Sequence, residues 1–206
     1  LLKRLSASKF INQIWLATAD NAVNQPLVDH VQKLGYSTYQ GDENDVLDRF
    51  YQASVKARAD IILRITGDCP LIDAVLVDQV IEKYLQSDAD YVSNCVPVSF
   101  PDGLDTEVFS FTALQRAWQE AEGQFNHEHV TPFLRESGLF KVTSVISDTD
   151  YSDERWTVDE PTDFDVVEAV FKYFHPRVDF SWTEVLELRH IQPQIFAANQ
   201  HLIRNE

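Results

Sequence analysis

Apolar residues in the first half of the chain alternate between short continuous runs and runs with helical spacing. Short apolar runs, which are typical of buried strands, occupy residues 11–18, 36–39, 59–63 and 89–92. Apolar positions three and four apart predict helices over residues 26–34 and 45–58 and from Val75 onward. The connections are brief, so the expected fold class is α/β, with a Rossmann-like, mostly parallel twisted sheet covered by helices on both faces.

The second half of the chain departs from this alternation. Residues 93–103 are irregular, and residues 104–109 alternate in polarity, with Asp105 and Glu107 on one face. This alternation predicts a small antiparallel portion beside the main sheet. Further helices are expected over residues 112–121, 126–135, 161–174 and 181–188, and further strands over residues 140–146 and 155–158.

The chain has 206 residues and no linker-like stretch along it, so residues 1–206 are expected to form a single domain. Residues 1–10 resemble the second half of a helix whose leucines lie on one side. The cations Lys3, Arg4 and Lys9 are expected on its outer side.

Composition narrows the function classes. The formal net charge of −16 argues against a nucleic-acid backbone as partner, because such proteins carry a basic footprint. No segment approaches the roughly eighteen apolar residues of a membrane span. The two cysteines, Cys69 and Cys95, are too few for a disulfide framework, and a reduced, cytoplasmic protein is expected.

The segment RITGDCPLID, residues 64–73, follows the apolar run at residues 59–63. Gly67 and Pro70 break the strand, and Asp73 is placed to cap the next helix. Asp68 would therefore lie at the carboxyl end of a strand, where open α/β sheets bind ligands. The alternative is that Asp68 only caps its turn.

Asp159 repeats the placement of Asp68, because it follows the short strand expected at residues 155–158 and precedes a helix that opens with Pro161. Two carboxylates at the ends of neighbouring strands suit Mg²⁺, which takes one or two carboxylates and further ligands from substrate phosphates. The alternative is that Asp159 only caps its helix.

Motifs spanning nearly the whole chain carry a resemblance to a known family. They are Gly41 with DVLDR (45–49), RITGDCPLID (64–73), DYVSN (90–94), FPDGLDTEVF (100–109), EHVTP (128–132) and RWTVDEP (155–161). In this order they resemble the cytidylyltransferases named for spore-coat polysaccharide biosynthesis, and more distantly the CMP-KDO and CMP-sialic acid synthetases.

The resemblance implies Mg²⁺-dependent transfer of CMP from CTP to a sugar, with release of pyrophosphate, for a surface polysaccharide or glycoprotein. By resemblance, Asp68 and Asp159 hold the metal and act in catalysis together with Arg64. The implied nucleotide-binding residues are Gly41, Arg49, Arg64 and Gly67, and the implied sugar-binding residues are Asp102, Asp105, Glu107 and His129. The resemblance also makes a homodimer plausible, with residues 93–103 as its contact region.

Simpler interpretations compete for several of these residues. Arg49 could form an i to i+4 ion pair with Asp45, and Asp105 and Glu107 could be the solvated face of an edge strand. His129 could cap or pack. A zinc site at His127 and His129 is disfavoured, because residues two apart on a helix point to different faces.

Catalysis by a cysteine and a metal motif of the glycosyltransferase type are both disfavoured. Cys69 lacks a histidine partner evident in the sequence and suits a small buried side chain better than a nucleophile. Asp88 and Asp90 have the D-x-D spacing of glycosyltransferase metal sites, but they precede their strand instead of following it.

The family's N-terminal strand and its phosphate loop are not found in residues 1–206. We expect such a strand between the strands that contain Trp15 and Leu63, because removing a central strand would leave buried backbone groups without partners. Direct pairing of those two strands would contradict this. A domain without the loop would be a non-catalytic nucleotide-sugar-binding domain, and a glycosyltransferase of related fold is the other alternative.

Overall fold

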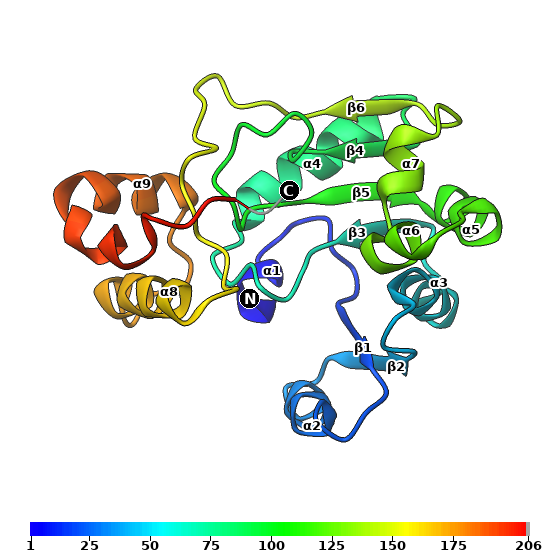
Figure 1. Ribbon diagram of the computed structural model, residues 1–206, viewed down its shortest axis with the longest axis horizontal. Helices are drawn as coiled ribbons and strands as arrows, with labels where there is room; N and C mark the ends of the chain where they lie inside the picture. The colour runs from blue at the N-terminus through cyan, green and yellow to red at the C-terminus, as the bar shows by residue number, and fades with distance from the viewer. Residues whose placement is uncertain (205–206) are drawn as a thin grey trace.

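The computed structural model describes residues 1–204, whose elements are arranged as shown in Figure 1. The helices are α1 (Leu2–Leu5), α2 (Gln25–Lys33), α3 (Val46–Ala57), α4 (Ala74–Gln86), α5 (Phe111–Glu120), α6 (Gln124–His129), α7 (Pro132–Glu136), α8 (Pro161–Phe174), α9 (Trp182–Ile191) and the 3-10 helix η1 (Pro193–Asn199). The strands are β1 (Trp15–Ala19), β2 (Ser37–Gly41), β3 (Ile61–Arg64), β4 (Tyr91–Ser93), β5 (Glu107–Ser110) and β6 (Val142–Ser144). No helix in this part of the chain is both long and apolar enough to cross a membrane.

The strands form two sheets. β1 and β2 form a parallel pair, which lies with α2 apart from the other four strands in Figure 1. The other four strands lie in the order β3-β5-β4-β6, with β5 antiparallel to both neighbours and β4 parallel to β6. The α/β class is confirmed. The mostly parallel sheet is confirmed only in part, because β5 separates β3 from β4 and is antiparallel to both.

Side chains on the four-stranded sheet alternate between two helical layers. Ile62, Tyr91 and Phe109 pack with α3, α5 and α7, whereas Val92 and Val108 pack with α4 and α1. Register explains the division, since Phe109 lies opposite both Ile62 and Tyr91 in neighbouring strands. The prediction of helices on both faces is therefore confirmed for this sheet.

A third apolar cluster joins α8, α9 and η1, with α8 and α9 grouped at the left end of the molecule in Figure 1. Trp156 and Phe180 are among its fully buried side chains. Arg4 reaches into this region and donates to the main-chain carbonyls of Leu71, Ile72, Val178 and Phe180. The expectation that Arg4 lies on the outer side was wrong. Helical spacing placed its side chain in solvent, but these four carbonyls accept hydrogen bonds from the guanidinium and allow it to be buried.

Two other expectations need correction. The helix predicted over residues 126–135 is split into α6 and α7, because Val130 has a φ of 71° and Pro132 lacks an N–H for a continuous helix. Residues 155–158 do not form the predicted strand. Their only β-type pairing among the described residues is an isolated parallel β-bridge between Arg155 and Asp102.

β1 and β3 belong to different sheets and do not pair with each other. Among the described residues β1 is hydrogen-bonded to β2 and β3 to β5, so each has one edge without a strand partner. Direct pairing of β1 with β3 would have contradicted the strand that we expect between them, and this pairing is not observed.

Gly103 holds the loop that precedes β5 against the main chain of Trp156 and Thr157. Its φ is +96°, and a Cβ atom there would lie 2.6 Å from the carbonyl carbon of Trp156. We expect Gly103→Ala to lower the free energy of unfolding by about 2–4 kcal/mol, from overpacking and positive φ together. Gly138→Ala is the matched control for urea denaturation, because Gly138 has a φ of +72° and nothing within 4 Å. If both variants lost the same free energy of unfolding, the loss could not be attributed to a clash between the new Cβ atom and the main chain of Trp156.

Candidate active site

Asp68 lies on the loop after β3, next to exposed Gly67, as the sequence predicted. Its main-chain carbonyl accepts hydrogen bonds from Val158 N at 2.9 Å and from Thr157 Oγ1 at 3.3 Å. Val158 immediately precedes Asp159, so the two loops that carry the aspartates lie against each other. Asp73 caps α4 as predicted, because its Oδ1 accepts from the backbone N–H of Val75 and Leu76.

Asp159 is not the cap of its helix. The N-cap of α8 is Glu160, which forms a capping box with Asp163. The Asp159 carboxylate instead accepts a hydrogen bond from Arg155 Nη2 at 2.7 Å, and its backbone N–H donates to Asp163 Oδ2. The capping interpretation of Asp159 was therefore wrong.

Arg155 is a buried guanidinium shared among three carboxylates. It contacts Asp163 through Nε at 3.0 Å and Nη2 at 2.8 Å, Asp159 through Nη2, and Asp102 through Nη1 at 3.3 Å. Asp163 is fully buried, and burial would raise its pKa. Hydrogen bonds from Arg155, Asn199 and the backbone outweigh burial and hold the pKa of Asp163 well below its ordinary value.

Asp102 and Asp105 lie together before β5 and share Arg204. Arg204 Nη2 lies 2.7 Å from each carboxylate oxygen of Asp105, and its Nε lies 3.8 Å from Asp102 Oδ1. Burial raises the pKa of Asp102 to about 6, with Arg204 opposing the rise and Asp105 adding to it. These two predicted sugar-binding residues are thus partly desolvated and lie beside the Arg155 group.

Glu107 points into the interior at the start of β5. Its carboxylate accepts from Tyr91 Oη and Thr131 Oγ1, each at 2.6 Å, and pairs with Arg64. The solvated-face interpretation was wrong for this residue. Burial alone would raise the pKa of Glu107, but Arg64 and the hydroxyl donors outweigh it and the pKa is lowered. Arg64 Nε is also buried, and it has no hydrogen-bond partner within residues 1–204.

Gly41 and Arg49 form a second group at the end of β2. A Cβ atom on Gly41 would lie 2.9 Å from Arg49 Cγ, so the glycine lets the arginine pass close to the strand. Arg49 Nη1 donates to the carbonyls of Asp42 and Glu43 at 3.1 and 3.3 Å. A cavity of about 440 Å³ opens beside them, lined by Asp20, Gly41, Asp42, Glu43 and Asn44.

The histidines of α6 have separate environments. His127 Nδ1 lies 3.0 Å from Asp45 Oδ1, a contact that raises the pKa of His127, whereas exposed His129 lies against Phe125 with ring centroids 4.6 Å apart. No group of three or more His, Cys, Asp and Glu residues that could hold a metal occurs in the described chain.

The residues where the Asp68 loop meets the Asp159 loop suit a hard cation. Burial raises the pKa of Cys69, which keeps a soft thiolate out of the donor set, and Cys69 Sγ lies 3.4 Å from Asp68 Oδ1. Two carboxylates match Mg²⁺, which completes its shell with substrate phosphates and water. Asp88 and Asp90, the D-x-D pair, are instead bound by the Nζ and the backbone N–H of Lys141.

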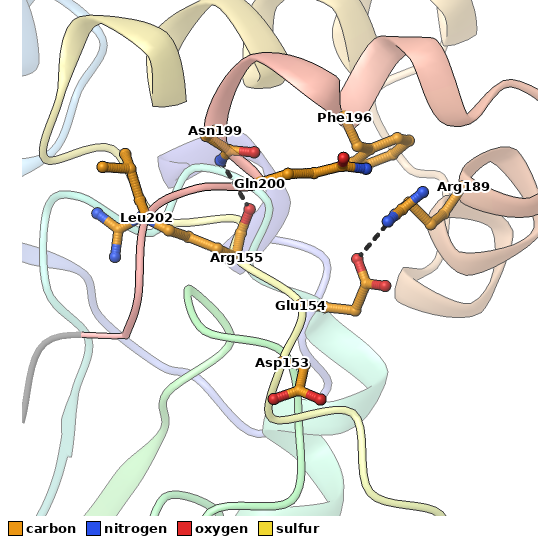
Figure 2. A pocket seen from close by; sticks show the side chains of 8 residues that line it. All are labelled: Asp153, Glu154, Arg155, Arg189, Phe196, Asn199, Gln200 and Leu202. Carbon is orange, nitrogen blue, oxygen red and sulfur yellow. Dashed lines mark hydrogen bonds and ion pairs between the residues drawn. The ribbon is translucent and has the colours of Figure 1, made fainter.

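A cavity of about 290 Å³ is lined by Arg155 and by residues of η1. Figure 2 shows its lining residues, which are Asp153, Glu154, Arg155, Arg189, Phe196, Asn199, Gln200 and Leu202. Asn199 Nδ2 donates to the main-chain oxygen of Arg155 at 3.1 Å, and Arg189 pairs with Glu154 at 3.3 Å.

The sequence predicted no role for Arg155 on its own, for Asp163, for Asn199 or for Arg204. The sequence does contain a signal for Asp163, because Pro161 marks the helix start and an acidic residue at the third helical position forms a capping box. Asn199 and Arg204 have no comparable signal, since their partners lie far away along the chain.

An α/β chain that carries two aspartates on adjoining loops, with arginines nearby, has the features of a nucleotidyltransferase. Residues 1–204 match the cytidylyltransferase family, so the chain belongs to this family of enzymes, which transfer a nucleotidyl group from CTP.

Four known proteins are similar to this chain. It is 36% identical to the uncharacterized protein MJ1063 of Methanocaldococcus jannaschii, over 98% of this chain and 83% of that protein. It is 28% identical to the spore coat polysaccharide biosynthesis protein SpsF of Bacillus subtilis, over 94% and 82%. Among solved structures, a cytidylyltransferase from Leptospira borgpetersenii superposes with a TM-score of 0.90, 27% identity and coverage of 100% and 86%. A CMP-2-keto-3-deoxy-manno-octonic acid synthetase in complex with CTP superposes with a TM-score of 0.60, 16% identity and coverage of 83% and 85%, and shares the fold.

Proposed function

We propose that this enzyme transfers CMP from CTP to a sugar, in a Mg²⁺-dependent reaction that releases pyrophosphate, for a surface polysaccharide or glycoprotein. The observation that carries the proposal is the main-chain contact between Asp68 and Val158, which puts the Asp68 and Asp159 loops together. The similarity to SpsF supports a polysaccharide product, and the match to the cytidylyltransferase family supports CTP as the donor. A reaction in the cytoplasm fits two cysteines that are both unpaired, Cys69 and Cys95.

Asp68 and Asp159 would hold the Mg²⁺ ion. When bound, the metal would neutralise charge on the triphosphate and stabilise the leaving pyrophosphate. A sugar oxygen would attack the α-phosphorus of CTP, and the protein's share of the work would be positioning and charge stabilisation. In this proposal the nucleotide contacts come from Gly41, Arg49, Arg64 and Gly67, and the sugar contacts come from Asp102, Asp105 and His129. Glu107, which the resemblance also implied as a sugar contact, is buried and paired with Arg64, and we propose that it acts through the fold.

Transfer from CTP also needs donors for the triphosphate. We propose that a strand followed by a phosphate-binding loop lies between β1 and β3. The separation of these two strands into different sheets supports this arrangement, because each has one edge without a strand partner among residues 1–204.

The proposal is tested by pyrophosphate release from the full-length protein with CTP, Mg²⁺ and a panel of acidic and neutral sugars. We expect release that depends on CTP, on one class of sugar and on Mg²⁺. CTP with Mg²⁺ should also raise the melting temperature, because a ligand at a hundred times its Kd adds about 2.7 kcal/mol to the free energy of unfolding. Binding of CTP without release with any sugar would favour a nucleotide-binding domain instead.

A further inference from the structure

Asp159 is fixed at two points by residues outside the aspartate pair. Its carboxylate Oδ2 accepts from Arg155 Nη2 at 2.7 Å, and its backbone N–H donates to Asp163 Oδ2 at 3.1 Å. Asp163 in turn binds Arg155 through both of its oxygens. The backbone and the side chain of Asp159 are therefore set by one buried Arg155–Asp163 pair.

Asn199, the last residue of η1, completes this arrangement from a distant part of the sequence. Its Nδ2 donates to the main-chain oxygen of Arg155 at 3.1 Å and to Asp163 Oδ1 at 2.9 Å. Asn199 is 3% exposed, so these bonds are shielded from water. Figure 2 shows the Asn199–Arg155 bond among the residues that line the cavity of about 290 Å³.

We propose that Arg155, Asp163 and Asn199 are positioning residues that orient Asp159 for metal binding, and that η1 is thereby a working part of the active site. This inference rests on the proposed function, since it assigns the network to the metal ligand of that reaction. Groups that hold a ligating carboxylate in place commonly change metal affinity or activity by about 10- to 100-fold when they are removed.

The chemistry of Arg155 explains why an arginine is needed at this position. Its planar guanidinium offers five N–H donors in a fixed geometry, and the structure uses Nε, Nη1 and Nη2 at once, on Asp163, Asp102 and Asp159. A lysine has one ammonium group on a flexible stem and cannot reach the three carboxylates in the same way.

The test compares full-length wild-type protein with Asn199→Ala and Arg155→Lys. Mn²⁺ serves as a spectroscopic probe in place of Mg²⁺, and its binding is followed by electron paramagnetic resonance in the presence of α,β-methylene-CTP, which cannot react. The melting temperature of each variant is measured alongside. Phe196→Leu is the matched control, because Phe196 is a buried residue of the same helix η1 and belongs to the apolar cluster, not to the hydrogen-bond network.

We expect Asn199→Ala and Arg155→Lys to weaken Mn²⁺ binding by about 10- to 100-fold. Phe196→Leu should lower the melting temperature and leave Mn²⁺ binding unchanged. Replacing the buried Arg155 carries a greater risk of disrupting folding than replacing Asn199. If Arg155→Lys does not fold, the Mn²⁺ affinity of Asn199→Ala decides whether the network positions Asp159. Wild-type Mn²⁺ affinity in a folded Asn199→Ala variant would overturn the positioning role and leave the proposed reaction standing. Absence of Mn²⁺ binding by wild-type protein would overturn the metal site together with the positioning role.

Discussion

Replacing Asp68 or Asp159 with asparagine is expected to reduce pyrophosphate release by about a thousandfold or more, which corresponds to about 4 kcal/mol in the barrier. Asparagine keeps the size of the side chain and removes its charge, so a bound Mg²⁺ would lose one of its two carboxylate ligands from the protein. The fold should survive both changes. The Asp68 loop is held through its main-chain carbonyl, and Arg155 keeps Asp163 as a partner when the Asp159 charge is removed.

The measurement is the initial rate of pyrophosphate release with saturating CTP, Mg²⁺ and the best sugar of the panel. Asp165→Asn is the matched control, because Asp165 is an exposed aspartate on α8, the helix that follows Asp159. We expect the control to retain wild-type activity. If an Asp68→Asn or Asp159→Asn variant with a normal melting temperature also retained wild-type activity, the assignment of that aspartate to the reaction would be refuted.

Local signals predicted the helices better than the sheet. The helix expected over residues 161–174 has the observed bounds, Pro161–Phe174, because Pro161 and the acidic residues around it specify where it starts. The position of β5 could not be predicted in this way. Alternating polarity indicates that a strand has one buried face, but it does not indicate which strands lie on either side of it. In the structure β5 lies between β3 and β4.

The candidate site shows the same limit. The sequence led to Asp68 and Asp159 because each follows a predicted strand, yet their loops meet through a main-chain hydrogen bond from Val158 and not through two strand ends. Asn199 was missed because its partners are Arg155 and Asp163, which are distant in sequence. Arg4 was misplaced for a related reason: its carbonyl acceptors come from two segments that only the folded chain brings together.

Glu107→Gln is expected to destabilise the fold strongly, by about 3–5 kcal/mol, the usual cost of removing one partner from a buried ion pair. Glu107 is 3% exposed and accepts from Arg64, Tyr91 and Thr131. A glutamine amide would turn an N–H donor toward one of these donors, and it would leave the Arg64 charge without its counter-ion.

The same loss should depend on pH. The pKa of Glu107 is lowered in the folded protein, so the carboxylate contributes its full stabilisation above the unfolded pKa of about 4.3 and loses it as the pH falls through the folded value. The difference in unfolding free energy between wild-type protein and Glu107→Gln should therefore be largest near neutral pH and shrink in acid. Urea denaturation at neutral and acidic pH measures this difference.

A double-mutant cycle separates the ion pair from a role in sugar binding. Arg64→Met with Glu107→Gln removes both charges, so the double variant should lose less stability than the sum of the two single losses. If Glu107 acts through the fold, Glu107→Gln should leave the KM for the sugar unchanged at a temperature where the variant is folded. A stable Glu107→Gln variant with a raised sugar KM would instead assign the carboxylate to the acceptor. Its burial against Tyr91, Thr131 and Arg64 favours the first outcome, because all three donors reach it from within the protein.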